Sequence, residues 1–469
     1  MIKFLIQKTF VLIFSAAAVV LLAVAITAPI ISFKWLYLAA GLVGVSFVAL
    51  VFANPLLALL IWMVSSPIFN FYIRIPLGAG IPDVTFTRIT VVGIFFVILL
   101  QSVFKLRTLR PIGKIEKFML AFCALAAMGI FFRGRWAENA QLLLDSYAFP
   151  FAMFYLAKNL VTSKKELKEF FYAIAILGFY LAAIGFIQYF VGVNLFTPED
   201  FSSIHAERAH GPFNNAVEYG SVMAVAGLAS FYLFTIIKKG FVKLLILMNI
   251  AIAAGAVFLS LTRAVWLSLL IAIVLILHYI PKYKKVFISC AAVALIVGAV
   301  FLLATDSSSI KERASQTGPI KSRMVLSATA TKTFLSKPVL GYGFGRYSFF
   351  EASKKFITSV GTAREEMGSV LTVPHNEFLH ILVMMGAVGL YIYLSIFGYS
   401  VKYSIRLYKD LDGEEIIQRN LIIFYWAILI IFIVNAFFVD MLFFSFFNSL
   451  IFLCAGIVNG YSCRRDSNQ

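Results

Sequence analysis

About 14 separate stretches of roughly 20 apolar residues divide this chain, and no other feature limits its fold as strongly. A helix needs ~20 apolar residues to cross the hydrocarbon core of a bilayer. Backbone polar groups in lipid must be satisfied within the helix, which excludes open sheets. Of 469 residues, 61% are hydrophobic and 13% charged, a balance typical of integral membrane proteins. The sequence therefore predicts an all-α polytopic integral membrane protein with a single transmembrane domain, residues 1–469.

The predicted spans cover the whole chain, and the alternative count is about 12. Pro55–Tyr72 is short and contains a proline, and only Asp440 separates the last two spans. Phe10–Ile31 follows a short basic start but is too long for a signal peptide, so we expect a retained helix. The predicted spans are Phe10–Ile31, Trp35–Ala53, Pro55–Tyr72, Thr85–Phe104, Ile115–Phe132, Gln141–Leu160, Phe170–Val191, Ala216–Ile237, Leu244–Leu261, Ala264–Ile280, Val286–Leu303, Phe378–Tyr399, Leu421–Val439 and Met441–Asn459.

Basic residues are distributed unevenly among the segments that connect these spans. With the N-terminus in the cytoplasm, nearly every Lys/Arg cluster falls on the cytoplasmic side, as the positive-inside rule predicts. Topology therefore accounts for the formal net charge of +18. A nucleic-acid partner would need a basic domain in water, and the sequence contains none.

Two connecting segments on the outer side are long, namely 192–215 and 306–375. Connections as long as the second are usually functional or disordered, and this one is not of low complexity. It is predicted to form helices at Lys321–Lys337 and Tyr347–Val360, separated by the glycine-rich turn Gly341–Gly345. We expect an ordered extracytoplasmic cap that lies against the membrane.

Three ionisable side chains are predicted to lie on this outer face. Arg208 precedes a span, Arg263 occupies a very short turn, and His375 stands where the long segment ends. Taken singly, they can be a loop charge, a snorkelling anchor and a helix-start histidine. Taken together, two guanidinium groups can bind phosphate oxygens, and a histidine beside them has a lowered pKa and can accept a proton. The combination indicates group transfer from a lipid-bound phosphate donor.

Other titratable residues have plainer interpretations. On a helix, His380 would point about 140° away from His375, which predicts a structural role. His210 is expected to be a solvated loop residue. Asp440 is expected to make a polar contact between helices, although burial in a membrane leaves a function open.

The segment that begins at His375 resembles a motif of the O-antigen ligase/polymerase superfamily, which assembles bacterial surface polysaccharides. The motif is His-Asn, nine residues, Gly, two residues and Gly, and it is matched by His375, Asn376, Gly386 and Gly389. Its position after the longest outer segment strengthens the resemblance. The two glycines also predict close approach of another backbone to this helix.

The resemblance extends over roughly 170–389. The family's first arginine, before a Gly-x-Phe-Asn segment, corresponds to Arg208, and its second, in a Ser/Thr-Arg turn, corresponds to Arg263. The run from Arg323 to the glycine-rich turn also resembles the family's loop. One departure is that a proline is missing after Gly-x-Phe, which leaves Glu218 one turn into a span. Glu218 is either an ion-pair partner of those arginines or a group that binds or activates the acceptor.

The resemblance implies an inverting, metal-independent glycosyl transfer from an oligosaccharide linked to undecaprenyl diphosphate, with no cofactor. It implies a bacterial cytoplasmic (inner) membrane protein whose site faces the periplasm or cell exterior. In this interpretation His375 deprotonates or orients the acceptor hydroxyl, while Arg208 and Arg263 stabilise the leaving diphosphate. Further substrate contacts are assigned to Asn376, Arg323, Tyr342, Arg346 and Glu218.

Three functions remain compatible with the sequence. A polymerase joins repeat units that are still on the lipid carrier, and a flippase and a chain-length regulator are its expected partners. A ligase moves the finished glycan to lipid A core or to a protein; the span count favours the polymerase. The third is a small-anion, bicarbonate-like transporter, which should place charges at mid-span in broken helices. Here the charges gather on one face.

Overall fold

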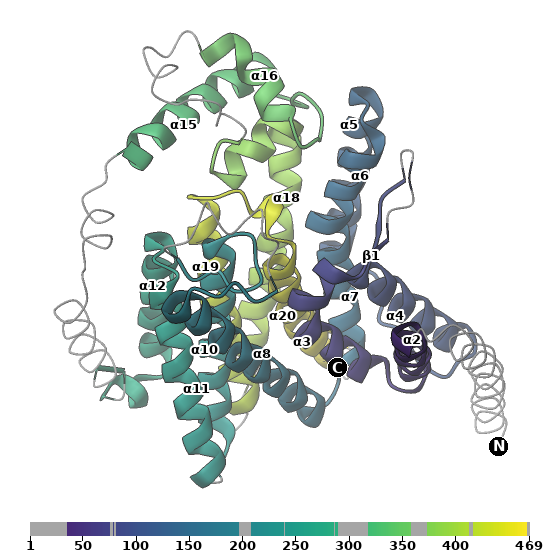
Figure 1. The fold of residues 1–469 in the computed structure, drawn as a ribbon, viewed down its shortest axis with the longest axis vertical. Coiled ribbons are helices and arrows are strands. Elements are labelled where there is room, and N and C mark those ends of the chain that lie inside the picture. The colour runs from purple at the N-terminus through teal and green to yellow at the C-terminus, as the bar shows by residue number, and fades with distance from the viewer. Residues whose placement is uncertain are drawn as a thin grey trace.

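The computed structural model describes residues 35–75, 78, 81–196, 208–238, 240–285, 287–288, 318–357, 373–411 and 416–466. Most of these residues are helical, which confirms the all-α class. The strands among them form one short antiparallel pair, β1 (Arg74–Ile75) with β2 (Val84–Thr85). Figure 1 shows long helices packed side by side, with α15 and α16 at one end of the bundle.

The helices have the following bounds in chain order: α2 (Trp35–Ala53), α3 (Pro55–Tyr72), α4 (Phe86–Val103), α5 (Lys114–Arg133), α6 (Trp136–Leu143), the π-helical turn η1 (Leu144–Ala148), α7 (Phe149–Leu160), α8 (Lys164–Val191), α10 (Ala216–Ile236), α11 (Gly240–Leu259), α12 (Arg263–Tyr279), the 3-10 turn η2 (Pro281–Tyr283), α15 (Gly318–Ser336), α16 (Ser348–Ile357), α18 (Glu377–Asp410), α19 (Ile416–Ala436), the 3-10 turn η3 (Met441–Phe443) and α20 (Ser445–Asp466).

Within the described ranges, eight helices are long and apolar enough to cross a membrane: α4, α5, α8, α10, α11, α18, α19 and α20. Shorter apolar helices occur at 44–53, 55–70 and 263–279. The chain is thus a multi-pass membrane protein. The predicted span Phe10–Ile31 and nearly all of Val286–Leu303 lie outside the described residues, so the total of 14 is not fixed by this structure.

Polar side chains at the start of several helices define where the apolar segments become helical. Asn54 accepts a hydrogen bond from the Leu57 N–H at 3.0 Å, and Pro55 follows as the first helical residue of α3. Ser163 and Glu166 form a capping box at the start of α8. Such caps satisfy N–H groups that have no partner inside the helix.

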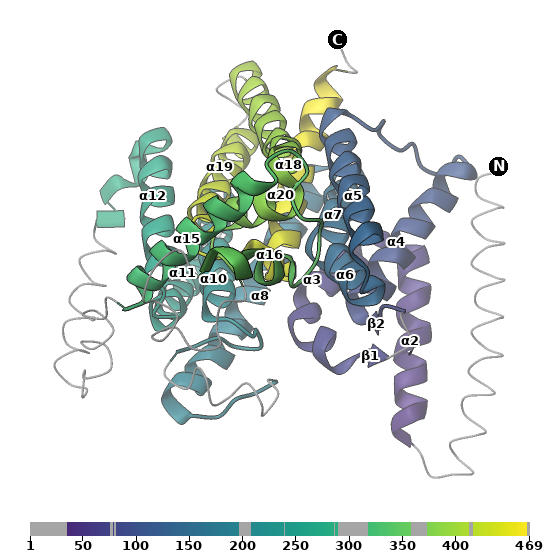
Figure 2. The ribbon, with the colours of Figure 1, turned by 90° about the horizontal axis from the view of Figure 1, so that it is seen from above.

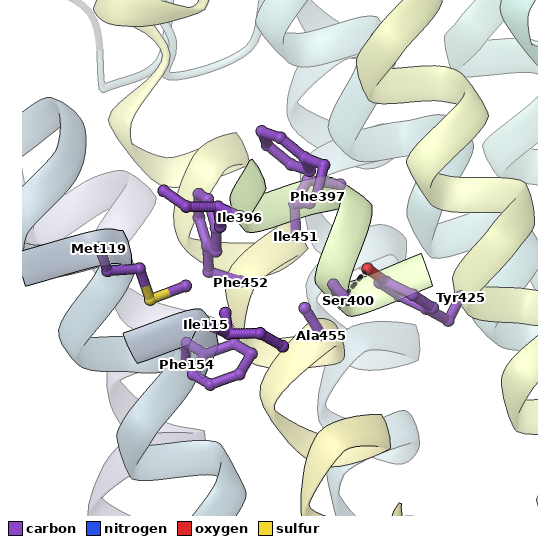
Figure 3. Close-up of a pocket in the computed structure, with 10 residues that line it drawn as sticks. All are labelled: Ile115, Met119, Phe154, Ile396, Phe397, Ser400, Tyr425, Ile451, Phe452 and Ala455. Carbon is purple, nitrogen blue, oxygen red and sulfur yellow. Dashed lines mark hydrogen bonds between the residues drawn. The ribbon is translucent and has the colours of Figure 1, made fainter. Parts of the chain in front are cut away.

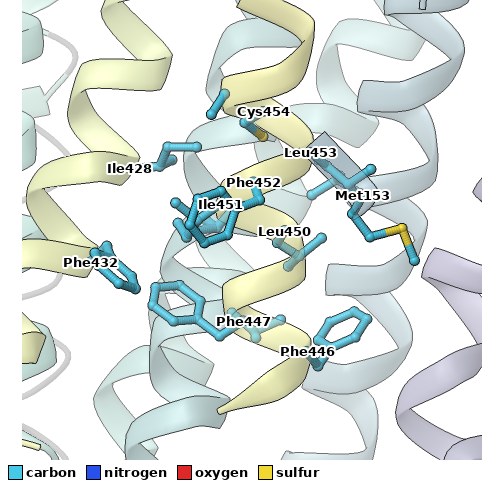
Figure 4. Close-up of a cluster of buried hydrophobic side chains, with 14 of the residues drawn as sticks. Met153, Ile428, Phe432, Phe446, Phe447, Leu450, Ile451, Phe452, Leu453 and Cys454 are labelled. Carbon is cyan, nitrogen blue, oxygen red and sulfur yellow. The ribbon is translucent and has the colours of Figure 1, made fainter. Parts of the chain in front are cut away.

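The bundle is organised around α20, of which 89% is buried over its most apolar 18-residue window. Side chains of α7, α19 and α20 interdigitate there, with Phe432 and Phe447 stacked at 6.2 Å between ring centroids (Figure 4). In α4, α5 and α11 only 33% of the corresponding window is buried. A helix that is apolar all round but buried on one side has lipid as its other neighbour.

A pocket beside this core is lined by side chains of α5, α7, α18, α19 and α20 (Figure 3). Its polar groups are the hydroxyls of Ser400 and Tyr425, which bond to each other at 2.5 Å. The remaining lining is apolar. This pocket is part of the packed interior and offers no group for chemistry.

The two helices predicted in the segment 306–375 are present as α15 and α16, and both contact the first half of α18 (Figure 2). We refer to residues 318–357, from α15 to α16, as the cap. A second small core joins these helices to α18; it consists of Leu326, Ala330, Phe349, Ala352 and Val383. Apolar side chains therefore fix the cap on the helix that starts just after His375.

Helix α18 is interrupted at Gly386, where φ is 65° and ψ is −167°. The chain between α15 and α16 crosses the break: Tyr342 N–H donates to the Val383 carbonyl at 2.8 Å, and Ala387 N–H donates to the Pro338 carbonyl at 2.8 Å. A side chain at Gly386 would overlap the Val339 backbone. The predicted close approach of a backbone is confirmed here, but the helix is not continuous through the glycines.

The glycine-rich turn also packs against α5. Phe344 is fully buried, and the backbone at Gly343 and Phe344 lies directly against Gly129. Arg133, the last residue of α5, donates to the Tyr342 carbonyl at 3.0 Å and forms an ion pair with Glu351 of α16. The cap is thus attached to the bundle on two sides, at α18 and at α5.

Candidate active site

His375 lies immediately before α18 in a backbone conformation that is uncommon for a residue with a side chain. Its φ is 52°, in the left-handed region. Asn376 caps the helix, because its Oδ1 accepts from the Leu379 N–H at 3.0 Å. Its Nδ2 donates to the Phe437 carbonyl at 3.2 Å. The His375 side chain, 39% exposed, therefore projects from the chain ahead of the helix.

The residue that faces His375 is Asp440, in the segment 437–444 between α19 and α20, which we name the Asp440 loop. The His375 Nδ1 atom lies 3.9 Å from Asp440 Oδ2, and the His380 Nδ1 atom lies 2.9 Å from Asp440 Oδ1. Asp440 and His380 are buried. Within the described residues Oδ2 has no hydrogen-bond partner, so it is available to His375. Two imidazoles thus share one buried carboxylate.

This arrangement corrects the prediction that His380 points away from His375. The predicted separation between His375 and His380 around a helix holds only if both residues are helical. The helix begins at Glu377, and His375 has a left-handed φ. The turn brings both rings to the same carboxylate. Asp440 does connect helices, as expected, but the atom it leaves open faces His375.

The pKa of His375 is lowered from its ordinary value, in the direction expected from the sequence. Partial burial is the main cause, and Arg323 and His380 lower the pKa further, whereas Asp440 raises it. From the sequence, Arg208 and Arg263 were expected to lower the pKa of His375. The balance favours a neutral ring near neutral pH, which is the form that can accept a proton.

Two of the candidate arginines are connected through the turn between α11 and α12. Arg208 Nη2 donates to the Leu261 carbonyl at 3.1 Å, and Ala209 N–H donates to the Leu259 carbonyl at 3.0 Å. Leu261 has a φ of 46°, and Arg263 begins α12 two residues later. Arg208 therefore supports the turn that presents Arg263, whose side chain is exposed.

Arg323 of the cap is the group that connects these arginines to the histidine. Its pKa is lowered by partial desolvation and by the positive charge of Arg263. Its own charge lowers the pKa of His375. Charges that influence one another in this way lie within a few ångströms to about a Debye length. Arg323 is thus close enough to Arg263 on one side and to His375 on the other for their charges to interact.

The loop that carries Arg208 is held by two residues that sequence reasoning missed or misjudged. His210 is buried, not solvated. Its Nδ1 lies 2.8 Å from the Phe213 carbonyl, which can only accept, so Nδ1 carries a proton. Its Nε2 then accepts from the Gln188 amide of α8 at 2.6 Å. The amide oxygen of Gln188 accepts from the His210 and Gly211 N–H groups, and only tertiary contacts reveal this support.

Glu218 is buried in α10, and its carboxylate accepts from the Phe447 N–H at 3.3 Å, in the first turn of α20. The first N–H groups of a helix have no partner inside the helix, and Glu218 supplies an acceptor for one of them. This contact stands in place of the ion pair with Arg208 or Arg263 that the sequence suggested. Glu218 thereby fixes α20, which follows the Asp440 loop.

The remaining candidates lie around the cap. The Tyr342 hydroxyl bonds to Ser336 at 2.6 Å, which ties it to α15. Arg346 is exposed, and its guanidinium carbon lies 6.0 Å from the ring centre of Phe443, at the end of the Asp440 loop. Arg346 therefore approaches that loop from the cap side. Among the side chains described, no group of three or more His, Cys, Asp or Glu is arranged to hold a metal ion.

The fold and this site define a class: a multi-pass membrane protein with a histidine–carboxylate pair beside a group of arginines. Residues 248–394 match the family model of the O-antigen ligase. The matched segment runs from α11 into α18 and contains Arg263, Arg323 and His375. The match supports the resemblance to the O-antigen ligase/polymerase superfamily. No curated protein matches the chain at a significant level.

Proposed function

We propose that this protein is an inverting, metal-independent glycosyltransferase that uses an oligosaccharide on undecaprenyl diphosphate as its donor. The match to the O-antigen ligase family supports a lipid-linked glycan as substrate and a role in polysaccharide biosynthesis. The observation that carries the proposal is the partly exposed His375 ring, which lies beside the buried Asp440 carboxylate and within the influence of the Arg323 charge. In this proposal the cap end of the bundle faces the periplasm or cell exterior.

The proposed reaction is a single displacement. The acceptor hydroxyl gives its proton to the His375 Nε2 atom, which is the ring nitrogen away from Asp440, and its oxygen attacks the anomeric carbon. The bond from that carbon to the diphosphate oxygen breaks, and undecaprenyl diphosphate leaves with the electron pair. Asp440 stabilises the imidazolium, as the carboxylate of a triad does.

The arginines act on the leaving group. Arg263 and Arg323 are assigned to the diphosphate oxygens, where charge increases as the bond breaks. Arg208 is assigned to the same site through the turn that it supports. Two mutually repelling guanidinium groups are stabilised when an anion binds between them. Asn376, Tyr342, Arg346 and Glu218 stay candidates for contacts with the sugar or the acceptor.

The direct test is glycosyl transfer by the purified protein. Wild type should extend a lipid-linked oligosaccharide, and His375→Ala should lower the rate by roughly 100- to 10,000-fold, as loss of a general base does. His278→Ala is the matched control, because His278 is an exposed histidine in the last turn of α12. Undiminished product from His375→Ala would show that His375 is not the general base. Loss of wild-type activity in EDTA would overturn the metal-free mechanism.

Polymerisation of repeat units is proposed as the first function and ligation as the second. The number of spans, which favoured the polymerase, is not fixed by the described residues. The acceptor that the protein uses therefore distinguishes a polymerase from a ligase. Supplied with the lipid-linked repeat unit alone, a polymerase forms longer lipid-linked chains. A ligase forms product only when lipid A core or an acceptor protein is added.

A further inference from the structure

Glu377 is a buried carboxylate that the proposed reaction does not use. It follows His375 by two residues, in the first turn of α18, and is fully buried. Its Oε1 accepts from the Tyr147 hydroxyl at 2.6 Å, and its Oε2 accepts from the Leu442 N–H at 3.0 Å. Burial of a carboxyl group is costly unless its oxygens are hydrogen-bonded, and these two bonds satisfy both oxygens of Glu377.

Both bonds of Glu377 lead toward the Asp440 loop. Leu442 follows Asp440 by two residues, and Glu377 holds its N–H. The Leu442 carbonyl accepts from the Ser146 hydroxyl, and the neighbouring Met441 carbonyl accepts from Asn448 Nδ2 at 2.8 Å. Leu442 is therefore held at both of its backbone polar groups, at the N–H by Glu377 of α18 and at the carbonyl by Ser146 of η1. The position of Asp440 relative to His375 depends on these hydrogen bonds to Leu442.

The π-helical turn η1 explains how consecutive residues can serve this loop. Ser146 and Tyr147 both face the Asp440 loop and the start of α18. Asp145, the residue before them, forms an ion pair with Arg88 of α4 at 2.7 Å. π-helical turns are rare and frequently lie at functional sites, since the extra residue changes where side chains point.

We propose that Glu377 and Tyr147 are positioning residues that hold the Asp440 carboxylate beside His375. The inference rests on the proposed function, in which His375 is the base. Neither residue touches the reacting atoms. The groups that act on the His375 ring are Asp440 from its loop, Arg323 from α15 and His380 from α18. If Asp440 shifts away from His375, the effects of Arg323 and His380 predominate and the pKa of His375 falls.

The kinetic test uses Tyr147→Phe, Glu377→Ala and the conservative Glu377→Gln. The first two should lower kcat roughly 10- to 100-fold, the effect of a misplacement of about 1 Å, with the donor KM unchanged. Glu377→Gln should retain most activity, because an amide oxygen can still accept from Leu442. Tyr425→Phe is the matched control; it removes another buried hydroxyl that bonds to a side chain, Ser400.

A second readout is independent of glycosyl transfer. The rate at which diethyl pyrocarbonate modifies His375, localised by mass spectrometry, reports the neutral ring as a function of pH. Its midpoint should move to lower pH by roughly half a pH unit or more in Tyr147→Phe and Glu377→Ala, because the attraction of Asp440 is weakened. Tyr425→Phe should leave the midpoint unchanged.

The two readouts separate the possible failures. If the wild type makes no product, the proposed function fails, and the labelling midpoint still tests the positioning role. If Tyr147→Phe has the wild-type kcat and midpoint, the positioning role is overturned. If Glu377→Ala does not fold, Tyr147→Phe decides the question alone, since it removes a single oxygen atom.

Discussion

At the scale of single residues, the candidate site depends on one carboxylate that serves two histidines. His380 holds Asp440 Oδ1 in the buried interior, and Oδ2 is left toward His375. The sequence predicts His375 and the arginines from their place at membrane edges. It does not predict that Asp440 is the neighbour of His375, because that contact depends on how α18 packs beside the loop that precedes α20.

The effect of Arg323 on His375 gives a prediction with a definite sign. A positive neighbour disfavours the imidazolium, so Arg323→Gln should raise the pKa of His375. The acid limb of the pH profile of kcat/KM should move to higher pH, and the donor KM should rise roughly 10-fold or more, as loss of a charged hydrogen bond does. Lys332→Gln removes an exposed charge from the same helix and is the control. An unchanged pH profile for Arg323→Gln would show that Arg323 does not influence His375.

At the scale of secondary-structure elements, α18 is two helical segments joined at Gly386. The chain that follows α15 donates to and accepts from the backbone groups that the break exposes. The sequence predicted close backbone approach from two glycines at helical spacing. It did not predict the break at Gly386, because a glycine inside an apolar run gives no sign that another segment of the chain crosses the helix there.

Gly386→Ala should destabilise the protein. Its φ and ψ fall in a region that essentially only glycine occupies, at a cost of about 1–3 kcal/mol, and a Cβ there meets the Val339 backbone. Thermal unfolding in detergent should show a lower Tm. Gly398→Ala is the matched control on the same helix, because a Cβ there meets nothing within 4 Å. Its Tm should stay the same or rise, as alanine favours helix more than glycine does.

At the scale of the whole molecule, the cap is fixed to two parts of the bundle that are distant in sequence. Its apolar side packs on α18, and its glycine-rich turn packs on α5. The candidate site lies beside the Asp440 loop at the start of α18, and Arg323 contributes its charge to it from the cap. Activity should therefore depend on the attachment of the cap.

Arg133→Ala should loosen that attachment. Arg133 bonds to the Tyr342 carbonyl and pairs with Glu351, and its side chain is only 15% exposed. Limited proteolysis should cut within 337–357 faster than in the wild type, and the transfer rate should fall. Arg406→Ala removes an exposed arginine that pairs with Asp410 and serves as the control. Equal cleavage rates in both variants would show that the ion pair does not hold the cap.

Much of the architecture could be predicted because it depends on local sequence. The limits of Trp35–Ala53 and Pro55–Tyr72 agree with α2 and α3, since apolar length and a capping Asn54 suffice to define them. The cap helices follow from helix-forming residues and their glycine-rich stop. The stretch Gln141–Leu160, predicted as one span, contains the turn η1, and nothing in its apolar pattern indicates that extra residue.

By itself the sequence determined the all-helical membrane class, the cap helices, the family resemblance and the choice of His375, Arg208 and Arg263. Those conclusions rest on apolar length, helix signals and short motifs, which act over a few neighbouring residues. Only the tertiary structure decided that Asp440, His380 and Arg323 surround His375, and that Glu377 and Tyr147 hold the Asp440 loop. These contacts join segments far apart in the chain, and packing sets them, because buried polar groups must find partners wherever the helices bring them.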